Sequence, residues 1–221
     1  MCGRFAFYSL DEATASLFGV SGAFPVEARY NIAPTQAIAA VRHDADRRRE
    51  AVLLRWGLVP SWAKDIAIGN RMINARAETV AEKPAYRAAY RHRRCILPAD
   101  GFYEWRTMGE GKTPYYITLA SGQPFAFAGL WETWQDRRSG ERIETATLIT
   151  ASANDFMTLL HHRMPLVLEA GTAEAWLAGD GVSELVDRTP RLRAWPVTRR
   201  VNNARNEGPE LIEPDGEILE G

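Results

Sequence analysis

The chain has 221 residues, with 46% hydrophobic and 25% charged side chains and a formal net charge of −1. These values are typical of a globular protein and exclude a disordered chain of low hydrophobicity and high charge. Because binding to a nucleic-acid backbone usually requires a basic surplus, the net charge gives no general reason to expect a nucleic-acid partner. Of the 27 basic residues only three are lysines, and arginine suits contacts to phosphate and stacking on flat rings. A GC-rich coding bias explains the same arginine content equally well.

No run of residues approaches the ~18 apolar residues that a membrane span needs, and the N-terminus lacks a secretory signal. We therefore expect a cytoplasmic protein that does not interact with a membrane. In a reducing compartment a disulfide between Cys2 and Cys95 is disfavoured. The four histidines and two cysteines show neither a CxxC nor an HExxH spacing, so we expect no metal site and no cofactor.

The first predicted element is a short helix over residues 10–18, because Ser9 and Glu12 have the spacing of a capping box. Apolar runs bounded by turn residues then predict strands at 37–41, 52–56, 94–97, 102–105, 115–119, 125–130, 145–150 and 194–197. Further helices are predicted at 84–91, 154–160 and 172–177. The polar stretches 43–50 and 137–141 are typical of hairpin tips.

Many strands with few short helices and no repeating βαβ order predict the α+β class. We expect a single compact domain over residues 2–214 around a mixed, mostly antiparallel, partly barrel-like β-sheet, followed by a C-terminal tail at 215–221. No internal repeat or linker divides the chain.

Cys2 stands next to the chain terminus. Methionine aminopeptidases remove Met1 when the second side chain is small, which would leave Cys2 with a free α-amine beside its thiol. Such an aminothiol can condense with an aldehyde to an imine and then close a five-membered thiazolidine ring on the same carbon. The alternative is a cysteine that lies second by chance in a buried first strand.

Three further polar motifs are candidates for chemistry. Asn74, Arg76 and Glu78 would share one face of an extended segment. An amide beside a guanidinium can bind a hydroxyl group next to a phosphate. The alternative is a polar strand face that is exposed to solvent. Glu104 lies between two aromatic residues, where desolvation would raise its pKa for proton transfer, unless it points to solvent from an edge strand. His161 could move a proton, and because neighbours on an extended segment face opposite ways, at most one of His161 and His162 serves a given site.

Seven motifs in order make the chain resemble one family. They are MCGRF at the start, YNIAPT from Tyr30, WGLVPSW from Trp56, INARAET from Ile73, CILPADGFYEW from Cys95, HHRMPLVL from His161 and VNN from Val201. Together they resemble the SRAP family of SOS-response-associated peptidases, also described as abasic-site processing proteins. The resemblance spans residues 2 to about 214.

The resemblance implies a protein of the DNA damage response that acts, as a monomer, on single-stranded DNA carrying an abasic site. The family's cysteine bonds to the aldehyde of the ring-opened sugar through a thiazolidine. Its catalytic residues fall on Cys2, Asn74, Glu104 and His161. Its DNA-binding positions fall on Arg4, Trp62, Arg76 and Arg163.

The chemistry of these side chains is compatible with the roles that the resemblance implies. Glu104 could accept and return the proton that imine formation moves, and His161 could protonate the departing sugar oxygen. Trp62 offers a flat surface for exposed bases. Two alternatives remain open: an N-terminal-nucleophile peptidase or amidohydrolase in which Cys2 attacks an amide, and a non-catalytic single-stranded DNA-binding module. An abasic-site lyase side reaction is also compatible, because an imine activates the strand for elimination.

Overall fold

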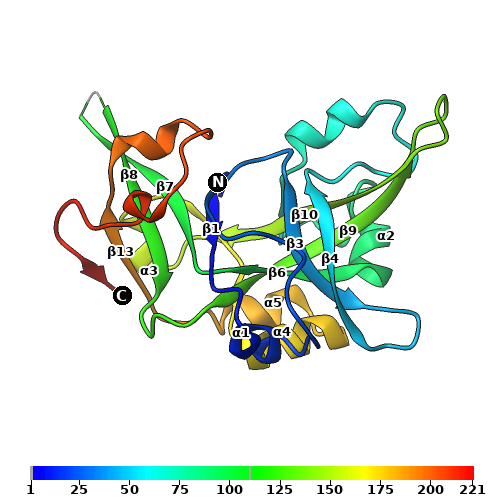
Figure 1. Cartoon of the computed structure of the whole chain (residues 1–221), viewed down its shortest axis with the longest axis horizontal. Helices are drawn as coiled ribbons and strands as arrows, with labels where there is room; N and C mark the ends of the chain where they lie inside the picture. Colours follow the sequence, from blue (N-terminus) through cyan, green and yellow to red (C-terminus); the bar gives the residue numbers. More distant parts are fainter. Residues whose placement is uncertain (1, 110) are drawn as a thin grey trace.

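A computed structural model describes residues 2–109 and 111–221. It contains two β-sheets side by side, with the N-terminal strand at the junction between them and short helices at the periphery (Figure 1). The first sheet has the strand order β14 (Leu219–Glu220), β13 (Leu192–Pro196), β8 (Gly111–Leu119), β7 (Gly101–Met108), β1 (Phe5–Phe7) and β2 (Arg29–Ile32). All of its pairings are antiparallel.

The second sheet contains a closed ring of strands. Its order is β11 (Arg163–Pro165), β10 (Arg142–Ser152), β4 (Arg49–Trp56), β3 (Ala37–His43), β6 (Arg94–Ala99), β9 (Phe125–Gln135) and β12 (Val167–Leu168), with β5 (Asn74–Arg76) paired to β10. Because β10 also pairs with β9, the strands β10, β4, β3, β6 and β9 close into a barrel. Two pairings, β10 with β4 and β10 with β5, are parallel.

Aromatic side chains join the two sheets where β1 begins. The ring of Phe5 lies edge-on to Trp56 of β4 and to Phe127 of β9, with ring centroids 5.2 and 5.6 Å apart. Each such pair contributes about 0.5–1.5 kcal/mol beyond its buried area. Residues 2–4 are therefore held at the junction of both sheets rather than extending freely into solvent.

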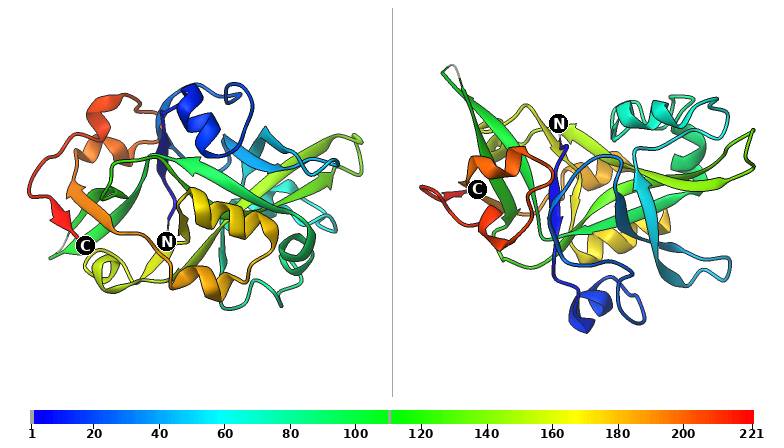
Figure 2. Two further views of the ribbon diagram at one scale, coloured as in Figure 1. Left: turned by 90° about the horizontal axis from the view of Figure 1, so that it is seen from below. Right: turned by 45° about the horizontal axis from the view of Figure 1, so that its top comes forward.

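The helices are short and lie outside the sheets. They are α1 (Glu12–Leu17), α2 (Arg87–His92), α3 (Asp155–Thr158), α4 (Ala170–Ala178) and α5 (Val182–Val186), with 3-10 turns η1 (Ile66–Arg71), η2 (Arg199–Asn202) and η3 (Pro209–Leu211). Helices α4 and α5 are neighbours against the barrel (Figure 2). The indole Nε1 of Trp176 in α4 donates to the carbonyl of Cys95 in β6 at 2.9 Å, which fixes the helix on the sheet.

The predicted fold class is confirmed: the molecule is α+β, with mixed, mostly antiparallel, partly barrel-like sheet structure and a few short helices. The eight predicted strands fall on β3, β4, β6, β7, β8, β9, β10 and β13, and the two predicted hairpin tips join β3 to β4 and β9 to β10. The three later predicted helices correspond to α2, α3 and α4, each with shifted ends.

The predicted cap of the first helix is wrong. Helix α1 begins at Glu12, and the carboxylate of Asp11, not the Ser9 hydroxyl, accepts the backbone N–H of Thr14 at 2.8 Å. Asp11 is in the extended conformation that a capping residue needs. The backbone N–H of Ser9 instead donates to the Asp100 carboxylate at 2.9 Å, which joins the segment after β1 to the turn before β7.

Several short elements escaped prediction, namely β1, β2, β5, β11, β12, β14 and α5. A strand of two to four residues shows too few alternations to be distinguished from a loop. Strand β14 pairs with β13, so part of the segment 215–221 adds an edge to the first sheet. Among the described residues, no helix is long and apolar enough to cross a membrane.

Candidate functional site

The strand pairing of β1 determines where Cys2 lies. Phe5 stands opposite Phe102 of β7, and the backbone N–H of Tyr103 donates to the carbonyl of Arg4 at 2.9 Å, so residues 2–4 run along the second half of β7. Cys2 is fully buried and belongs to the main hydrophobic core. Its thiol is free and lies 3.8 Å from the Arg4 carbonyl.

Asn74 binds the main chain of Cys2 directly. It is the first residue of β5, and its Nδ2 donates to the Cys2 carbonyl at 2.8 Å. Its own carbonyl accepts the Tyr86 hydroxyl at 3.3 Å, and burial raises the pKa of Tyr86 to about 12, which keeps that hydroxyl a donor. The Oδ1 of Asn74 is buried and has no hydrogen-bond partner within residues 2–109 and 111–221. A buried acceptor therefore lies open beside Cys2, available to a ligand hydroxyl or an amine.

Glu104 is buried on the same side of β7 as the site. It lies in an interior strand, between β1 and β8, and is only 3% exposed, so the solvent-facing alternative is wrong. Burial raises the pKa of its carboxyl. Burial, and then the charge of Glu104, raise the pKa of the Cys2 thiol, which shows that the two groups lie within electrostatic range of each other.

His161 follows α3 and is partly exposed. Its Nδ1 lies 3.0 Å from both the backbone N–H and the carbonyl of Arg163, which fixes the ring. Burial lowers its pKa, so the imidazole is neutral at pH 7. The expectation that His161 and His162 face opposite ways is wrong, because the segment bends and the rings stack at 4.3 Å. His162 is within electrostatic range of Glu104, so both histidines lie beside the site.

Arg4 is anchored two residues from Cys2. Its Nη1 donates to the Oδ1 of Asn31 and to the carbonyl of Val201, both at 2.7 Å. Asn31 is fully buried in β2, and its Nδ2 donates to the carbonyls of Asn203 and Asn206 at 3.0 and 2.8 Å. One amide thus fixes the Arg4 guanidinium and the loop 203–206 together.

Arg163 is already engaged in an ion pair. Its two terminal nitrogens pair with both carboxylate oxygens of Glu78, and Nη2 also donates to the Thr150 carbonyl at 2.7 Å. Glu78 lies in the turn after β5, beyond the strand face that Asn74 and Arg76 share. The pair links the segment that carries His161 to the one that carries Asn74.

The remaining predicted residues are exposed. Trp62, in the loop between β4 and η1, is 55% exposed, and Arg76 is exposed at the end of β5, opposite Thr150 of β10. A hydrogen bond joins Asn74 to Cys2, and electrostatic interactions join Glu104 to Cys2 and to His162, the neighbour of His161. Within the part of the chain that the structure describes, no hydrogen bond or ion pair links Trp62 to this cluster.

Asn31 and Tyr86 were not predicted as part of the site, whereas Glu78 was predicted on one polar face with Asn74 and Arg76. Asn31 carries a signal that is readable in sequence, a polar amide between Tyr30 and Ile32. The Tyr86 contact depends on how the chain between β5 and α2 folds back, which no local pattern encodes.

Comparison with known proteins agrees with this architecture. The family model of the SOS response associated peptidase (SRAP) matches residues 1–204. The abasic site processing protein YoaM of Bacillus subtilis is 40% identical, over 99% of this chain and all of its own. The abasic site processing protein YedK of Escherichia coli is 33% identical, over 97% of this chain and all of its own. A crystal structure of a protein from Bacteroides thetaiotaomicron has a TM-score of 0.83 at 24% identity, covering 96% of this chain and 99% of that one, and so shares the fold. The chain therefore belongs to the SRAP family.

Proposed function

We propose that this protein processes abasic sites by bonding Cys2 covalently to the aldehyde of the opened sugar in single-stranded DNA. The proposal requires that Met1 be removed, so that Cys2 carries the free α-amine. One observation carries it: Asn74 holds the Cys2 carbonyl and leaves a buried acceptor open beside it. The curated relatives that match over nearly the full chain are abasic site processing proteins, which supports the same conclusion.

The reaction begins at the amine rather than at the thiol. Burial raises the pKa of the thiol, whereas an α-amine has a reference pKa of about 7.7 and is partly neutral at cellular pH. The amine nitrogen attacks the aldehyde carbon to give a carbinolamine. Loss of water gives the imine, and the thiol sulfur then adds to the same carbon while its proton passes to the nitrogen. The product is a thiazolidine, with one water lost overall.

Glu104 moves the proton in this sequence. A buried carboxyl with a raised pKa is protonated over a wider pH range than a free one, so it can protonate the departing hydroxyl of the carbinolamine. His161, fixed by Arg163, protonates the sugar oxygen as the ring opens when it is in its imidazolium form, which burial makes the minor form at pH 7. Asn74 Oδ1 accepts from the sugar hydroxyl or from the α-amine.

The DNA strand is held by residues around this cluster. Arg4 is a fixed cation two residues from Cys2, and Arg76 is an exposed one at the end of β5. Trp62 offers an exposed ring for base stacking, worth about 1–3 kcal/mol per base. Arg163 can reach a phosphate only while sharing its donors with Glu78, which makes it the most constrained of the four.

The other two hypotheses predict different chemistry. An N-terminal-nucleophile peptidase needs a thiolate at Cys2, and burial disfavours the thiolate. A non-catalytic binding module needs neither the thiol nor the amine. A lyase side reaction follows from the proposal itself, because Cys2→Ala keeps the amine, forms the imine and allows elimination to cut the strand.

The test is incubation with a single-stranded abasic oligonucleotide, followed by denaturing electrophoresis. We expect a heat-stable shifted band with the natural protein and none with Cys2→Ser, which cannot close the sulfur-containing ring. Cys95→Ser is the matched control, because Cys95 is the second free, fully buried cysteine. It is expected to form the band normally.

A band that survives in Cys2→Ser would show that another residue bonds to the DNA. Turnover of peptide substrates without any band would favour the hydrolase instead. Equal affinity of the natural protein and Cys2→Ala for abasic and intact strands, again without a band, would favour the binding module.

A further inference from the structure

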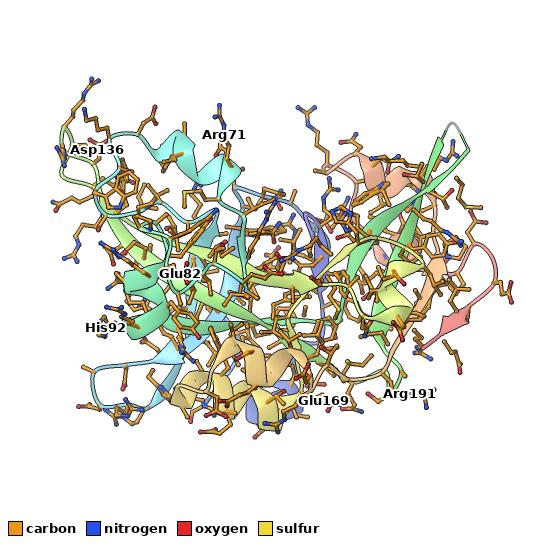
Figure 3. All side chains as sticks on the ribbon, turned by 180° about the vertical axis from the view of Figure 1, so that it is seen from behind. Arg71, Glu82, His92, Asp136, Glu169 and Arg191 are labelled. Carbon is orange, nitrogen blue, oxygen red and sulfur yellow. The ribbon has the colours of Figure 1, made fainter. Side chains whose placement is uncertain are left out.

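A second polar cavity lies at the end of the molecule away from the N-terminus. It has a volume of about 350 Å³ and is formed where the turn between β3 and β4, the end of α2, the start of β6 and the end of α4 meet. Its lining includes His43, Arg47, Arg91, His92, Arg94 and Trp131. In Figure 1 the β3–β4 turn and α2 lie together at this end, and Figure 3 places His92 at the corresponding edge.

Arg94 forms the buried part of this lining. It is half-buried between the rings of Tyr90 and Trp176, 4.6 and 4.2 Å from their centroids. Its Nε and Nη1 donate to the carbonyls of Tyr90, Trp176 and Asp180. Within residues 2–109 and 111–221, Nη2 makes no hydrogen bond and the guanidinium makes no ion pair. A positive charge is thus held in place with one donor still available.

The acidic groups nearby do not neutralise the cavity. Asp44 lines it, but its Oδ1 accepts the backbone N–H groups of Asp46 and Arg48 at 2.9 and 2.8 Å, and its Oδ2 lies 3.6 Å from Nε of Arg48, so its charge is paired within its own turn. Asp180 acts on Arg94 electrostatically without forming an ion pair. Burial, together with the charges of Arg47 and Arg49, lowers the pKa of His43, as expected in a positive field.

Arg47 occupies an unusual backbone position. Its φ is 61°, in the left-handed region that glycine and asparagine adopt most easily and that costs other residues about 1–2 kcal/mol. Arg47 and Arg91 make no ion pair with any described residue. An arginine without an ion pair, at a backbone position that favours glycine, indicates that its side chain has a role other than stabilising the turn.

We propose that this cavity binds a phosphate group, held by Arg47, Arg91 and Arg94. Three guanidinium groups from separate elements converge on one space, which is the arrangement that recognises a doubly charged phosphate. The volume and the wall of Trp131 admit the nucleoside attached to that phosphate. The phosphate comes either from a free nucleotide or from a nucleic-acid strand, and its site is separate from Cys2.

The sources are distinguished by three probes: inorganic phosphate, adenosine 5′-monophosphate and an intact single-stranded oligonucleotide without an abasic site. Binding is measured by calorimetry at constant ionic strength. The test variant is R47G combined with R91Q, because glycine suits the φ of residue 47 and neither side chain is buried. The matched control is R137A combined with R87A, which removes two exposed arginines outside the cavity, one from the β9–β10 hairpin turn and one from the same helix.

We expect saturable binding of at least one probe, weakened about tenfold or more by R47G/R91Q and less than twofold by R137A/R87A. If R47G/R91Q loses binding of the monophosphate, the ligand is a free nucleotide. If it loses binding of the oligonucleotide alone, the ligand is a nucleic-acid strand. Cys2→Ala is expected to leave the binding of phosphate and monophosphate unchanged. Two results would overturn the proposal: no saturable binding in any arm, or equal losses in both double variants, which would show a diffuse surface charge.

Discussion

The two cysteines lie in regions that are equally buried and chemically different. Cys2 and Cys95 are both fully buried, and burial raises the pKa of both thiols. Cys95 lies in a barrel strand, where its sulfur faces Gly129 and its carbonyl accepts the Trp176 indole. Cys2 lies at the sheet junction beside a carboxyl and an amide with an open acceptor. Burial therefore does not distinguish the two cysteines; under the proposed function, the neighbours of Cys2 and its place beside the chain terminus do.

The variant with the largest expected effect on the Cys2 region is Glu104→Gln, which removes the proton-transfer group but keeps the side-chain shape. We expect the rate of adduct formation to fall by about 10²–10⁴-fold, the usual contribution of general acid–base catalysis. Single-turnover kinetics with an abasic oligonucleotide measure it. A rate within threefold of the natural protein would remove Glu104 from the mechanism.

The same variant has a pH-dependent stability signature that follows from the burial of the Glu104 carboxyl. Because burial raises the folded-state pKa of Glu104, the folded protein keeps this proton at pH values where the unfolded chain, with a pKa of about 4.3, has lost it. The contribution of Glu104 to stability is thus greatest at low pH and falls as the pH rises toward the folded pKa. Glu104→Gln is expected to be at least as stable as the natural protein at pH 7, measured by chemical denaturation.

Asn31→Ala tests the anchoring of Arg4 on the Cys2 side. The change removes one partner of the Arg4 guanidinium and the donor to the carbonyls of Asn203 and Asn206, and we expect the free energy of unfolding to fall by about 2–3 kcal/mol. Affinity for single-stranded DNA is expected to fall as well. Asn154→Ala is the matched control, because that amide caps α3 and its loss should cost about 1 kcal/mol without changing DNA affinity.

Asn74→Ala and Asn74→Asp separate the two functions of that amide. Alanine removes both the donor to Cys2 and the open acceptor, and we expect adduct formation to slow about 10- to 100-fold, since a buried hydrogen bond of this kind is worth about 1–3 kcal/mol. Aspartate keeps an acceptor but no donor. If the hold on the Cys2 carbonyl is what matters, the two variants will be equally slow; a faster aspartate variant would assign the effect to the open acceptor.

Trp176→Phe is the smallest change and acts on the Cys95 side only. It removes one hydrogen bond to the Cys95 carbonyl, and we expect a loss of about 1 kcal/mol in the free energy of unfolding. Adduct formation at 25 °C is expected to stay normal. A clear loss of reactivity would mean that the two cysteine regions are coupled through the barrel.

The sequence predicted the parts of the molecule whose signals are local. The long strands of the barrel alternate or run apolar over many residues, and Asp155–Thr158 follows an asparagine suited to capping. The three-residue strands β1, which positions the preceding Cys2, and β5, which begins at Asn74, lacked such signals. Their positions come from long-range pairing with β7 and β10, which no local pattern records.

The same distinction between local and long-range signals applies to the candidate site. Residue chemistry and motif order pointed to Cys2, Asn74, Glu104 and His161; the structure shows a hydrogen bond from Asn74 to the Cys2 carbonyl and an electrostatic interaction between Cys2 and Glu104. The stacked histidines, the pairing of Arg163 with Glu78 and the amide of Asn31 required coordinates, because each depends on how a loop turns. The cavity of arginines was hidden for the same reason, since its lining comes from the β3–β4 turn, α2, β6, β9 and α4.

The central claim is that the terminus of the chain, and not the thiol alone, is the reactive unit. Intact-mass spectrometry of the protein, with and without an abasic oligonucleotide, tests it most directly. The account predicts that the free protein lacks Met1 and that the adduct mass equals protein plus oligonucleotide minus one water, heat-stable without a reducing agent. An adduct on chains that retain Met1, or the same heat-stable mass with Cys2→Ala, would contradict it.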